Sequence, residues 1–143
     1  DLKKQYDFRR IEIVREYAPD LGGVECQTTE IEQVFFNIVK NAAQALSELP
    51  KDGPPPRITL RTLGLGGMAV AEIEDNGPGM DEETRKRIFE PFYTTKAVGV
   101  GTGLGLSVAY FIISENHKGS IVVESAPGRG ALFRVSLPFN RVG

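Results

Sequence analysis

The sequence predicts an α+β two-layer sandwich, in which a mixed, mostly antiparallel sheet carries helices on one face. Three observations lead to this prediction: apolar residues alternate in several short stretches, glycine turns join those stretches in pairs, and amphipathic helical stretches lie between the pairs. Strands joined by tight turns pair antiparallel, which leaves the helices to cover one face. The 143 residues, 41% apolar and 25% charged, are enough for one globular domain.

The N-terminal half is predicted as a strand, a helix and a hairpin. Residues 1–8 show no clear pattern, and we expect 1–143 to be one domain, with 1–10 as a linker remnant from a longer chain. Residues 11–17 alternate as a strand. Thr29 and Glu32 have the spacing of a capping box and predict the start of an amphipathic helix that stops at Pro50. Two strands, 57–63 and 69–75, then flank a glycine turn at 64–67.

The C-terminal half is predicted as two helices and a second hairpin. Asp81 is placed to cap a short helix that is acidic in its first turn and basic in its last, as the helix dipole favours. A third helix is predicted over about 104–116. The strands 120–124 and 132–137 flank a turn at 127–130 and close the sheet.

Charge and cysteine content narrow the classes of function. A formal net charge of −2 argues against a nucleic-acid or polybasic membrane binder, and no apolar run approaches the length of a membrane span. We therefore expect no direct membrane contact by this domain and a cytoplasmic location, which leaves open a parent protein anchored in a membrane. Cys26 is the only cysteine, which excludes an internal disulfide and fits a reducing compartment. The only histidine, His117, is far from it in sequence, so a structural role is favoured for Cys26.

Asp75 and a nearby glycine turn are the first candidate site. Side chains alternate along a strand, so Asp75 shares a face with Ile73 and continues an apolar, inward row. A carboxylate is costly there without a partner. Asp75 also opens the turn Asp75-x-Gly77-x-Gly79, where glycine lets the backbone bend closely.

A second glycine turn, Gly101-Thr102-Gly103-Leu104-Gly105, opens onto the predicted third helix. The unpaired N–H groups and positive dipole at a helix start favour an anion such as a phosphate. The two turns together indicate a nucleotide held at both ends. The P-loop pattern G-x-x-x-x-G-K-S/T is absent, the spacing differs from the dinucleotide pattern G-x-G-x-x-G, and the eukaryotic-type kinase signatures are missing.

An ordered set of motifs connects these turns to a known family. Asn37 and Asn41, four residues apart on one helix face, precede the Asp75 turn, the stretch 89–96 and the second glycine turn. In this order and spacing the chain resembles the ATP-binding catalytic domain of bacterial sensor histidine kinases, over about 11–139. These belong to the superfamily of gyrase, chaperone and mismatch-repair ATPases. The run 91–106 is most similar to the nitrogen-regulation or PAS-linked subgroup.

The resemblance implies a function. The domain would bind ATP with Mg²⁺ and donate the γ-phosphate to a histidine on a separate dimerisation and histidine phosphotransfer domain of the same protein. A response regulator receiver domain would be an indirect partner. Two alternatives remain open: a serine-directed kinase of the same superfamily, and a nucleotide-sensing interaction module without chemistry.

The resemblance also assigns roles around the base and the metal. Asp75 would accept a hydrogen bond from the adenine amino group, and Gly77 and Gly79 would let the backbone approach the base. Asn41 matches the magnesium ligand. Asn37 is a catalytic position at which related ATPases carry a glutamate general base; an amide cannot take a proton, which argues against hydrolysis. Read without the family, the two asparagines would be solvated residues on an exposed helix face.

The phosphates would contact the second glycine turn, that is Gly101, Thr102, Gly103, Leu104 and Gly105. Lys96 is either a phosphate contact that stabilises charge during transfer or a solvated loop lysine. Tyr93 would lie near the nucleotide, whereas Phe89 and Phe92 fit packing or docking roles.

Two positions depart from the family or stand outside its motifs. Ala131 follows Gly128-Arg129-Gly130, where family members commonly have a threonine that holds adenine through water, so we expect modestly weaker binding. His117 lacks the helical His-Glu pattern of a phosphoacceptor, and its place between a helix and Gly119 indicates a structural role.

Overall fold

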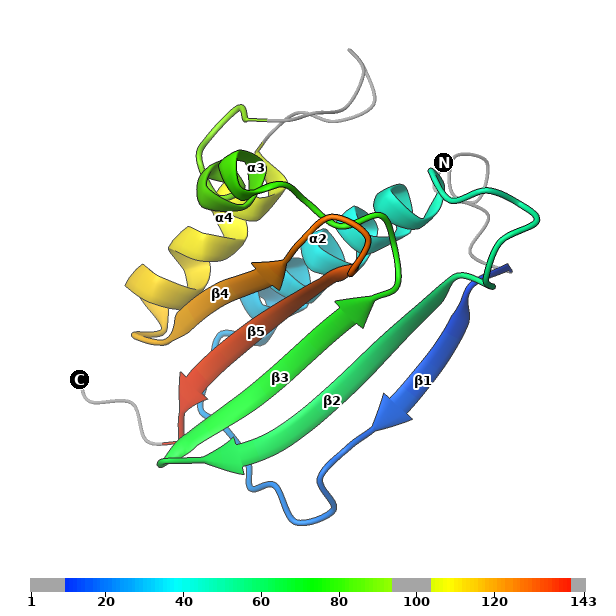
Figure 1. Ribbon diagram of the computed structural model, residues 1–143. Coiled ribbons are helices and arrows are strands. Elements are labelled where there is room, and N and C mark those ends of the chain that lie inside the picture. Colours follow the sequence, from blue (N-terminus) through cyan, green and yellow to red (C-terminus); the bar gives the residue numbers. More distant parts are fainter. Residues whose placement is uncertain (1–9, 94–103, 140–143) are drawn as a thin grey trace.

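The computed structural model of the chain describes residues 10–93 and 104–139. The sheet has five strands in the order β1-β2-β3-β5-β4. Strand β1 runs parallel to β2, and the other neighbours are antiparallel. The helices lie behind one face of the sheet (Figure 1), which confirms the predicted α+β sandwich.

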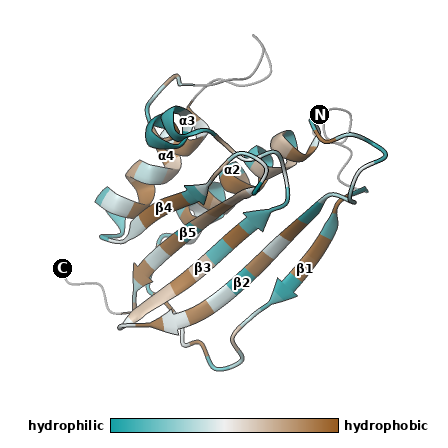
Figure 2. Ribbon diagram, in the orientation of Figure 1, coloured by the Kyte–Doolittle hydropathy of each residue, from teal (hydrophilic) through white to brown (hydrophobic). Residues whose placement is uncertain are grey.

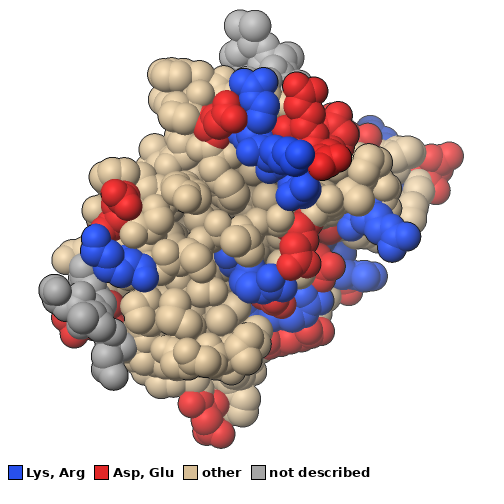
Figure 3. Space-filling view, turned by 60° about the vertical axis from the view of Figure 1, so that its left-hand side comes forward, with Lys and Arg blue, Asp and Glu red and all other residues tan. Residues whose placement is uncertain are grey.

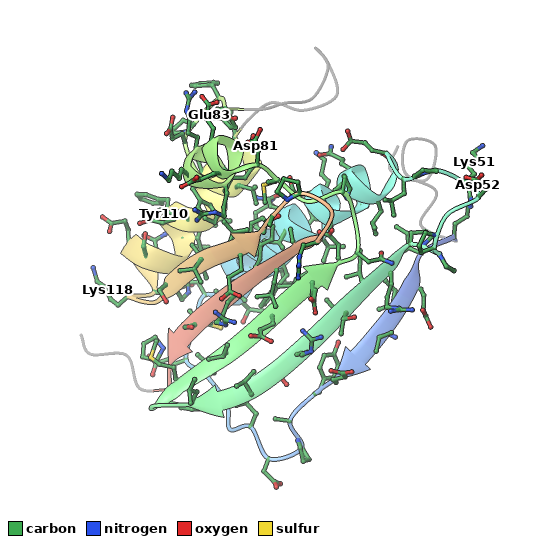
Figure 4. The ribbon with its side chains drawn as sticks, in the orientation of Figure 1. Lys51, Asp52, Asp81, Glu83, Tyr110 and Lys118 are labelled. Atoms are coloured by element: carbon green, nitrogen blue, oxygen red, sulfur yellow. The ribbon has the colours of Figure 1, made fainter. Side chains whose placement is uncertain are left out.

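The elements follow the predicted order. They are β1 (Glu12–Glu16), α2 (Thr28–Leu46), β2 (Arg57–Leu65), β3 (Met68–Asp75), α3 (Glu82–Arg87), α4 (Gly105–Phe111), the π-helical turn η2 (Ile112–Asn116), β4 (Ser120–Ser125) and β5 (Ala131–Pro138). Asp81 caps α3 as predicted, because its Oδ1 accepts the N–H of Thr84 at 2.8 Å. It lies where the chain enters α3 (Figure 4).

The predicted capping box at Thr29 is wrong. Helix α2 begins at Thr28 with Gln27 as its N-cap residue, and no side chain makes a capping hydrogen bond there. The backbone N–H of Gln27 instead donates to Nε2 of His117 at 3.0 Å. A tertiary contact from a residue 90 positions away thus holds the entry to the helix.

Two other boundaries differ from the prediction. Helix α2 ends at Leu46, before Pro50, and the chain continues with i→i−3 bonds that tighten its last turn. Strand β2 continues to Leu65, so the hairpin turn shortens to Gly66 and Gly67, with φ values of 60° and 77°. Positive φ at both central residues is the geometry that suits a two-residue hairpin.

The predicted third helix is two elements. Leu104 is the N-cap residue, α4 ends at Phe111, and η2 continues the chain with the wider π-helical turn. The carbonyl of Ile112 lies 2.9 Å from Nδ1 of His117. The wide turn also leaves Ile112 and Ile113 buried under the sheet.

The core lies between the inner face of the sheet and α2, α4 and η2. Apolar and polar residues alternate along much of β2 (Figure 2), and buried residues alternate with half-buried ones along β5. The central contacts come from Ile58, Ile73, Phe133, Val135, Val34, Ile38, Ala109 and Ile113, all of which are buried. This core fixes the faces of β3 and α2 that carry the predicted site.

The outer face of the sheet carries a charge ladder, defined as Glu16, Arg61, Glu72, Arg134 and Glu124. Arg61 lies 3.0 Å from Glu16 and 3.6 Å from Glu72, and Arg134 lies 2.9 Å from Glu72 and 2.8 Å from Glu124. The ladder crosses all five strands. On the face shown in Figure 3, basic and acidic groups lie next to one another. Such a polar outer face suits a sheet with one face in water.

Candidate functional site

Asp75 ends β3 with its side chain inside the molecule, as the strand alternation predicts. It pairs with Ile58 on one side and Ala131 on the other, and it is only 4% exposed. The N–H of Gly77 donates to its Oδ1 at 2.8 Å. The buried carboxylate therefore lies between the loop after β3 and the start of β5.

Burial raises the pKa of Asp75 to about 6, while hydrogen bonds from the backbone of Gly77 and Ala131 pull the pKa down and the nearby charge of Glu74 pushes it up. Desolvation is the largest of these effects because it disfavours the charged form. At neutral pH the carboxylate is mostly ionised in a poorly solvated position. It is therefore well suited to accept a further hydrogen bond from a ligand.

Position 77 requires a glycine because the side chain of Asp75 lies close to its backbone. A Cβ at position 77 would lie 2.8 Å from Oδ1 of Asp75 and 3.4 Å from Cβ of Ala45 on α2. A larger residue would therefore displace the carboxylate or the helix. The backbone of this turn also lies against α2.

Gly79 makes a different close approach from the predicted one. Its φ is 76°, and a Cβ there would collide with the carbonyl oxygen of Ala126. The described contact is thus with the loop between β4 and β5. Whether the same glycine also approaches a base stays a prediction.

The loop after β3 is tied to the loop between β4 and β5. The N–H of Gly128 donates to the carbonyl of Pro78 at 2.7 Å. Ser125 Oγ accepts the N–H of Met80 at 2.9 Å and donates to the carbonyl of Gly130 at 2.6 Å. The sequence analysis did not single out Ser125, because a serine at a strand end carries no signal for a partner 45 residues away.

Asn37 joins α2 to the start of α4. Its Nδ2 donates to the carbonyl of Gly105 at 2.9 Å. Its Oδ1 accepts from Nε2 of Gln33 at 2.8 Å. The structure therefore brings the predicted catalytic asparagine against the end of the second glycine turn. The sequence analysis gave Gln33 no role, although its i−4 spacing from Asn37 was a usable signal.

One face of α2 spans both predicted ends of the site. Asn37 contacts Gly105, and Ala45 packs against Gly77, so the two contacts are separated by roughly 12 Å of helix. Asn41 lies midway, four residues from each, on the same face. The helix thus places the predicted magnesium ligand between the Asp75 turn and the start of α4.

The aromatic residues after α3 have separate environments. Tyr93 donates from its hydroxyl to Oγ1 of Thr84 at 3.2 Å, and the guanidinium of Arg87 lies 4.5 Å from its ring centre. Phe89 packs against the rings of Tyr110 and Phe133, in agreement with the packing role.

Phe92 instead is 73% exposed and has a φ of 66°, which is unusual for a residue with a bulky side chain. The proposed contacts of Lys96, Gly101, Thr102 and Gly103 lie outside the described residues. Leu104 and Gly105 are described, as the N-cap and first residue of α4.

The metal-ligating side chains near the site suit a magnesium ion that is held mainly by the phosphates of a bound nucleotide. Among the described residues there is no group of three or more His, Cys, Asp or Glu side chains that could hold a metal ion. Mg²⁺ commonly keeps several waters and shares phosphate oxygens with one or two protein ligands, so it does not need such a group. The amide of Asn41 is a suitable single ligand.

His117 is a core residue, only 1% exposed. Its Nε2 accepts the N–H of Gln27, so Nδ1 carries the proton and donates to the carbonyl of Ile112 at 2.9 Å. Asn116 adds a hydrogen bond to the carboxylate of Glu30 at 3.2 Å. The sequence interpretation of His117 as structural is confirmed.

A cavity of about 340 Å³ lies beside this arrangement, between the end of β3 and the outer face of β2. Arg57, Thr59 and Arg61 line it from the outer face of β2, because they alternate with Ile58, and Asp75 and Asn76 at the end of β3 line it too, with Gly128, Arg129 and Gly130 of the loop before β5. The arginines are already paired with Glu12, Glu16 and other acids of the sheet. The cavity therefore borders the candidate site at Asp75, and its polar side chains come from the outer face of the sheet.

The fold and the family comparison place the chain in the ATPase class named for histidine kinases, gyrase and chaperones. A family model described as "Histidine kinase-, DNA gyrase B-, and HSP90-like ATPase" matches residues 26–141. The chain belongs to this family.

Individual relatives specify the branch. Sporulation kinase E of Bacillus subtilis is 38% identical over 137 residues, covering 96% of this chain and 18% of the relative. The histidine-protein kinase AtoS of Escherichia coli is 40% identical over 135 residues, covering 94% and 21%. The chain thus spans about a fifth of these relatives. It is an ATP-binding catalytic domain of the bacterial sensor histidine kinase type, as the motifs predicted.

Solved structures agree with this assignment. The catalytic domain of histidine kinase ThkA has a TM-score of 0.77 and 30% identity, over 96% of this chain and 91% of that one. ThkA in complex with the response regulator protein TrrA has a TM-score of 0.74 and 27% identity, over 97% and 38%. Within the part of this chain that the structure describes, no helix has the length and apolar character needed to cross a membrane.

Proposed function

We propose that this domain binds ATP with Mg²⁺ along the exposed side of α2 and donates the γ-phosphate to a histidine on a separate helical domain. The observation that carries the proposal is the single α2 face that meets Gly77 beside Asp75 at one end and Gly105 at the other. A ligand with a base and a phosphate chain fits between them.

Adenine is the base that suits Asp75. The carboxylate is buried, holds backbone hydrogen bonds and can accept another from an exocyclic amino group. Guanine would present an oxygen at that place, so two acceptors would face each other. The acceptor therefore selects adenine, even though Ala131 supplies no hydroxyl for a bridging water.

The phosphates belong at the start of α4. We place them against the glycine turn 101–105, with Lys96 as a further contact and Thr102 and Leu104 in the same turn. Asn41 would hold Mg²⁺, which neutralises phosphate charge there. Tyr93, anchored on α3, would border the nucleotide.

Asn37 favours transfer over hydrolysis. Its amide holds Gly105 and accepts from Gln33, and an amide has no basicity with which to activate water. The γ-phosphate would therefore persist until a protein acceptor arrives. This chemistry fits a kinase better than the hydrolytic members of the family.

An exposed apolar stripe on α4 offers a docking surface for the acceptor domain. Leu104, Val108 and Phe111 have i, i+4, i+7 spacing and are 38%, 41% and 56% exposed. Phe92 adds an exposed ring from the loop after α3. We propose that a dimerisation and histidine phosphotransfer domain of the same protein docks here, joined through residues 1–10. The crystallised pair of ThkA and a response regulator supports a receiver domain as an indirect partner. We propose a cytoplasmic location for the domain.

A transfer experiment tests the proposal. Calorimetry should show ADP binding that strengthens with Mg²⁺, and the chain alone should hydrolyse ATP at a negligible rate. ATP labelled at the γ-position should then label a supplied phosphoacceptor helical domain, in an acid-labile form that marks phosphohistidine. Acid-stable label would indicate the serine-directed alternative, and ADP binding with no transfer would indicate a sensing module.

A further inference from the structure

A relay of two amides leads from α2 to α4. Gln33 Nε2 donates to Oδ1 of Asn37 at 2.8 Å, and Asn37 Nδ2 donates to the carbonyl of Gly105 at 2.9 Å. The direction of the relay follows from chemistry, because a backbone carbonyl can only accept. Asn37 must therefore turn its NH₂ group to Gly105 and its oxygen to Gln33.

We propose that Gln33 is a positioning residue for nucleotide binding, which acts through Asn37 on the start of α4. An asparagine amide can rotate by half a turn with little change in shape. Rotation would set its oxygen against the oxygen of Gly105, and the donor of Gln33 stabilises the opposite, productive orientation. Aligned hydrogen bonds also strengthen one another, so losing Gln33 weakens the bond to Gly105.

The relay acts at one end of α4 only. The far end of the helical segment is held by buried His117 and by Asn116, which bond to the N-terminal part of α2. The near end begins with Gly105. A Cβ there would lie 3.6 Å from Cγ of Asn37, which is an ordinary van der Waals distance, so close steric contact does not hold Gly105 against Asn37. Leu106 anchors this end in the core, and the hydrogen bond from Asn37 fixes the carbonyl of Gly105, at the first residue of the helix.

Gln33 lies far from the end of α2 that is proposed to adjoin the base. Asp75 and Gly77 meet α2 at Ala45, three turns from Gln33 along the helix. Gln33 is itself exposed and has no contact with the Asp75 turn among the interactions of the described residues. Its loss should weaken the contacts to the phosphates and leave those to adenine unchanged. The inference rests on the function proposed above.

The test compares two ligands on the full 143-residue chain. Gln33→Met keeps the length and neutrality but removes the donor, and it should weaken ADP binding about 3- to 10-fold in calorimetry. Adenosine affinity should stay within twofold. Gln33→Glu should weaken ADP further, and Thr29→Glu, an exposed site one turn away with the same added charge, should leave it unchanged.

A second measurement needs no nucleotide. The amide of Val108 donates to the carbonyl of Leu104 in the first turn of α4, and its hydrogen exchange should quicken in Gln33→Met by about the same factor. In an Asn37→Ala background, Gln33→Met should have no further effect on exchange or ADP affinity.

The results separate the two proposals. Unchanged exchange at Val108, equal losses for ADP and adenosine, or an undiminished Gln33 effect in Asn37→Ala would each overturn the role of Gln33. A parent chain that binds neither ADP nor adenosine, while Val108 exchange still responds to Gln33→Met, would instead overturn the proposed function.

Discussion

The carboxylate of Asp75 accepts the N–H of Gly77 at 2.8 Å, two residues further along the chain, at a position that is 4% exposed. The glycine lets the chain turn back on the carboxylate without a Cβ between them. The short turn keeps an acid group in the core, where burial raises its pKa to about 6. The stability of the fold is thereby linked to the charge of one side chain, and the proposed nucleotide binding would be linked to the same charge.

The first prediction concerns stability against pH. Because the pKa of Asp75 is raised from 3.8 to about 6, the folded chain binds more protons than the unfolded chain between these values. This group's contribution is therefore largest below pH 4 and is lost as the pH rises through 6, a change of about 3 kcal/mol. Asp75→Asn should remove this dependence.

Urea unfolding of the parent and of Asp75→Asn, from pH 4 to pH 7.5, measures the effect. As the pH rises, the free energy of unfolding of the variant should increase relative to that of the parent, because only the parent loses the contribution of Asp75. A constant difference across this range would contradict the buried, titrating carboxylate.

The second prediction concerns nucleotide affinity at the same residue. ADP binding that uses the ionised Asp75 should weaken as the pH falls below about 6, and below that pH binding should release a proton. Calorimetry in buffers of different ionisation enthalpy detects this release. Asp75→Asn should bind ADP at least tenfold more weakly at pH 7.5 while remaining folded; equal affinity would exclude the adenine contact.

The third prediction concerns Gly77→Ala. The new Cβ would lie 2.8 Å from Oδ1 of Asp75 and would push the carboxylate from its hydrogen bond. We expect a loss of about 1–3 kcal/mol of stability and a clear loss of ADP affinity. Gly23→Ala is the matched control, because nothing lies within 4 Å of its Cβ. Similar effects of the two substitutions would argue against steric need at position 77.

The fourth prediction concerns His117→Ala. The ring is buried and its two nitrogens bond to Gln27 and Ile112, so truncation leaves a cavity and two unpaired backbone groups. We expect a loss of about 3–5 kcal/mol in chemical denaturation. Glu115→Ala, an exposed neighbour, should change stability by less than about 0.5 kcal/mol.

The fifth prediction separates docking from nucleotide binding. Phe111→Ser removes part of the exposed stripe on α4, so phosphotransfer to the helical acceptor domain should fall while ADP affinity stays constant. Leu65→Ser, at an exposed residue of the β2–β3 hairpin, is the control and should affect neither. Transfer that proceeds at the parent rate in Phe111→Ser would place docking elsewhere.

Local patterns predicted much of the fold because they follow from backbone geometry. Alternation with period two placed Asp75 inside, and the spacing of four residues placed Asn37 and Asn41 on one helix face. The order of strands and helices followed from the same signals. The roles of these residues toward a nucleotide came from a resemblance, and the relatives confirm the family while the individual roles stay predictions.

Other features depend on residues that are distant in sequence. The start of α2 is held by His117 rather than by a capping box at Thr29, and Gly79 is required by the carbonyl of Ala126. The charge ladder needs the register of five strands before its partners can meet.

By itself, the sequence determined the class of fold, the inward Asp75 and the order of the motifs, because each rests on short-range periodicity. Only the tertiary structure decided that Asn37 holds Gly105 and that Ala45 packs on Gly77. Those contacts arise when core packing brings α2 against both the end of β3 and the start of α4. No local sequence pattern specifies how closely these elements approach one another.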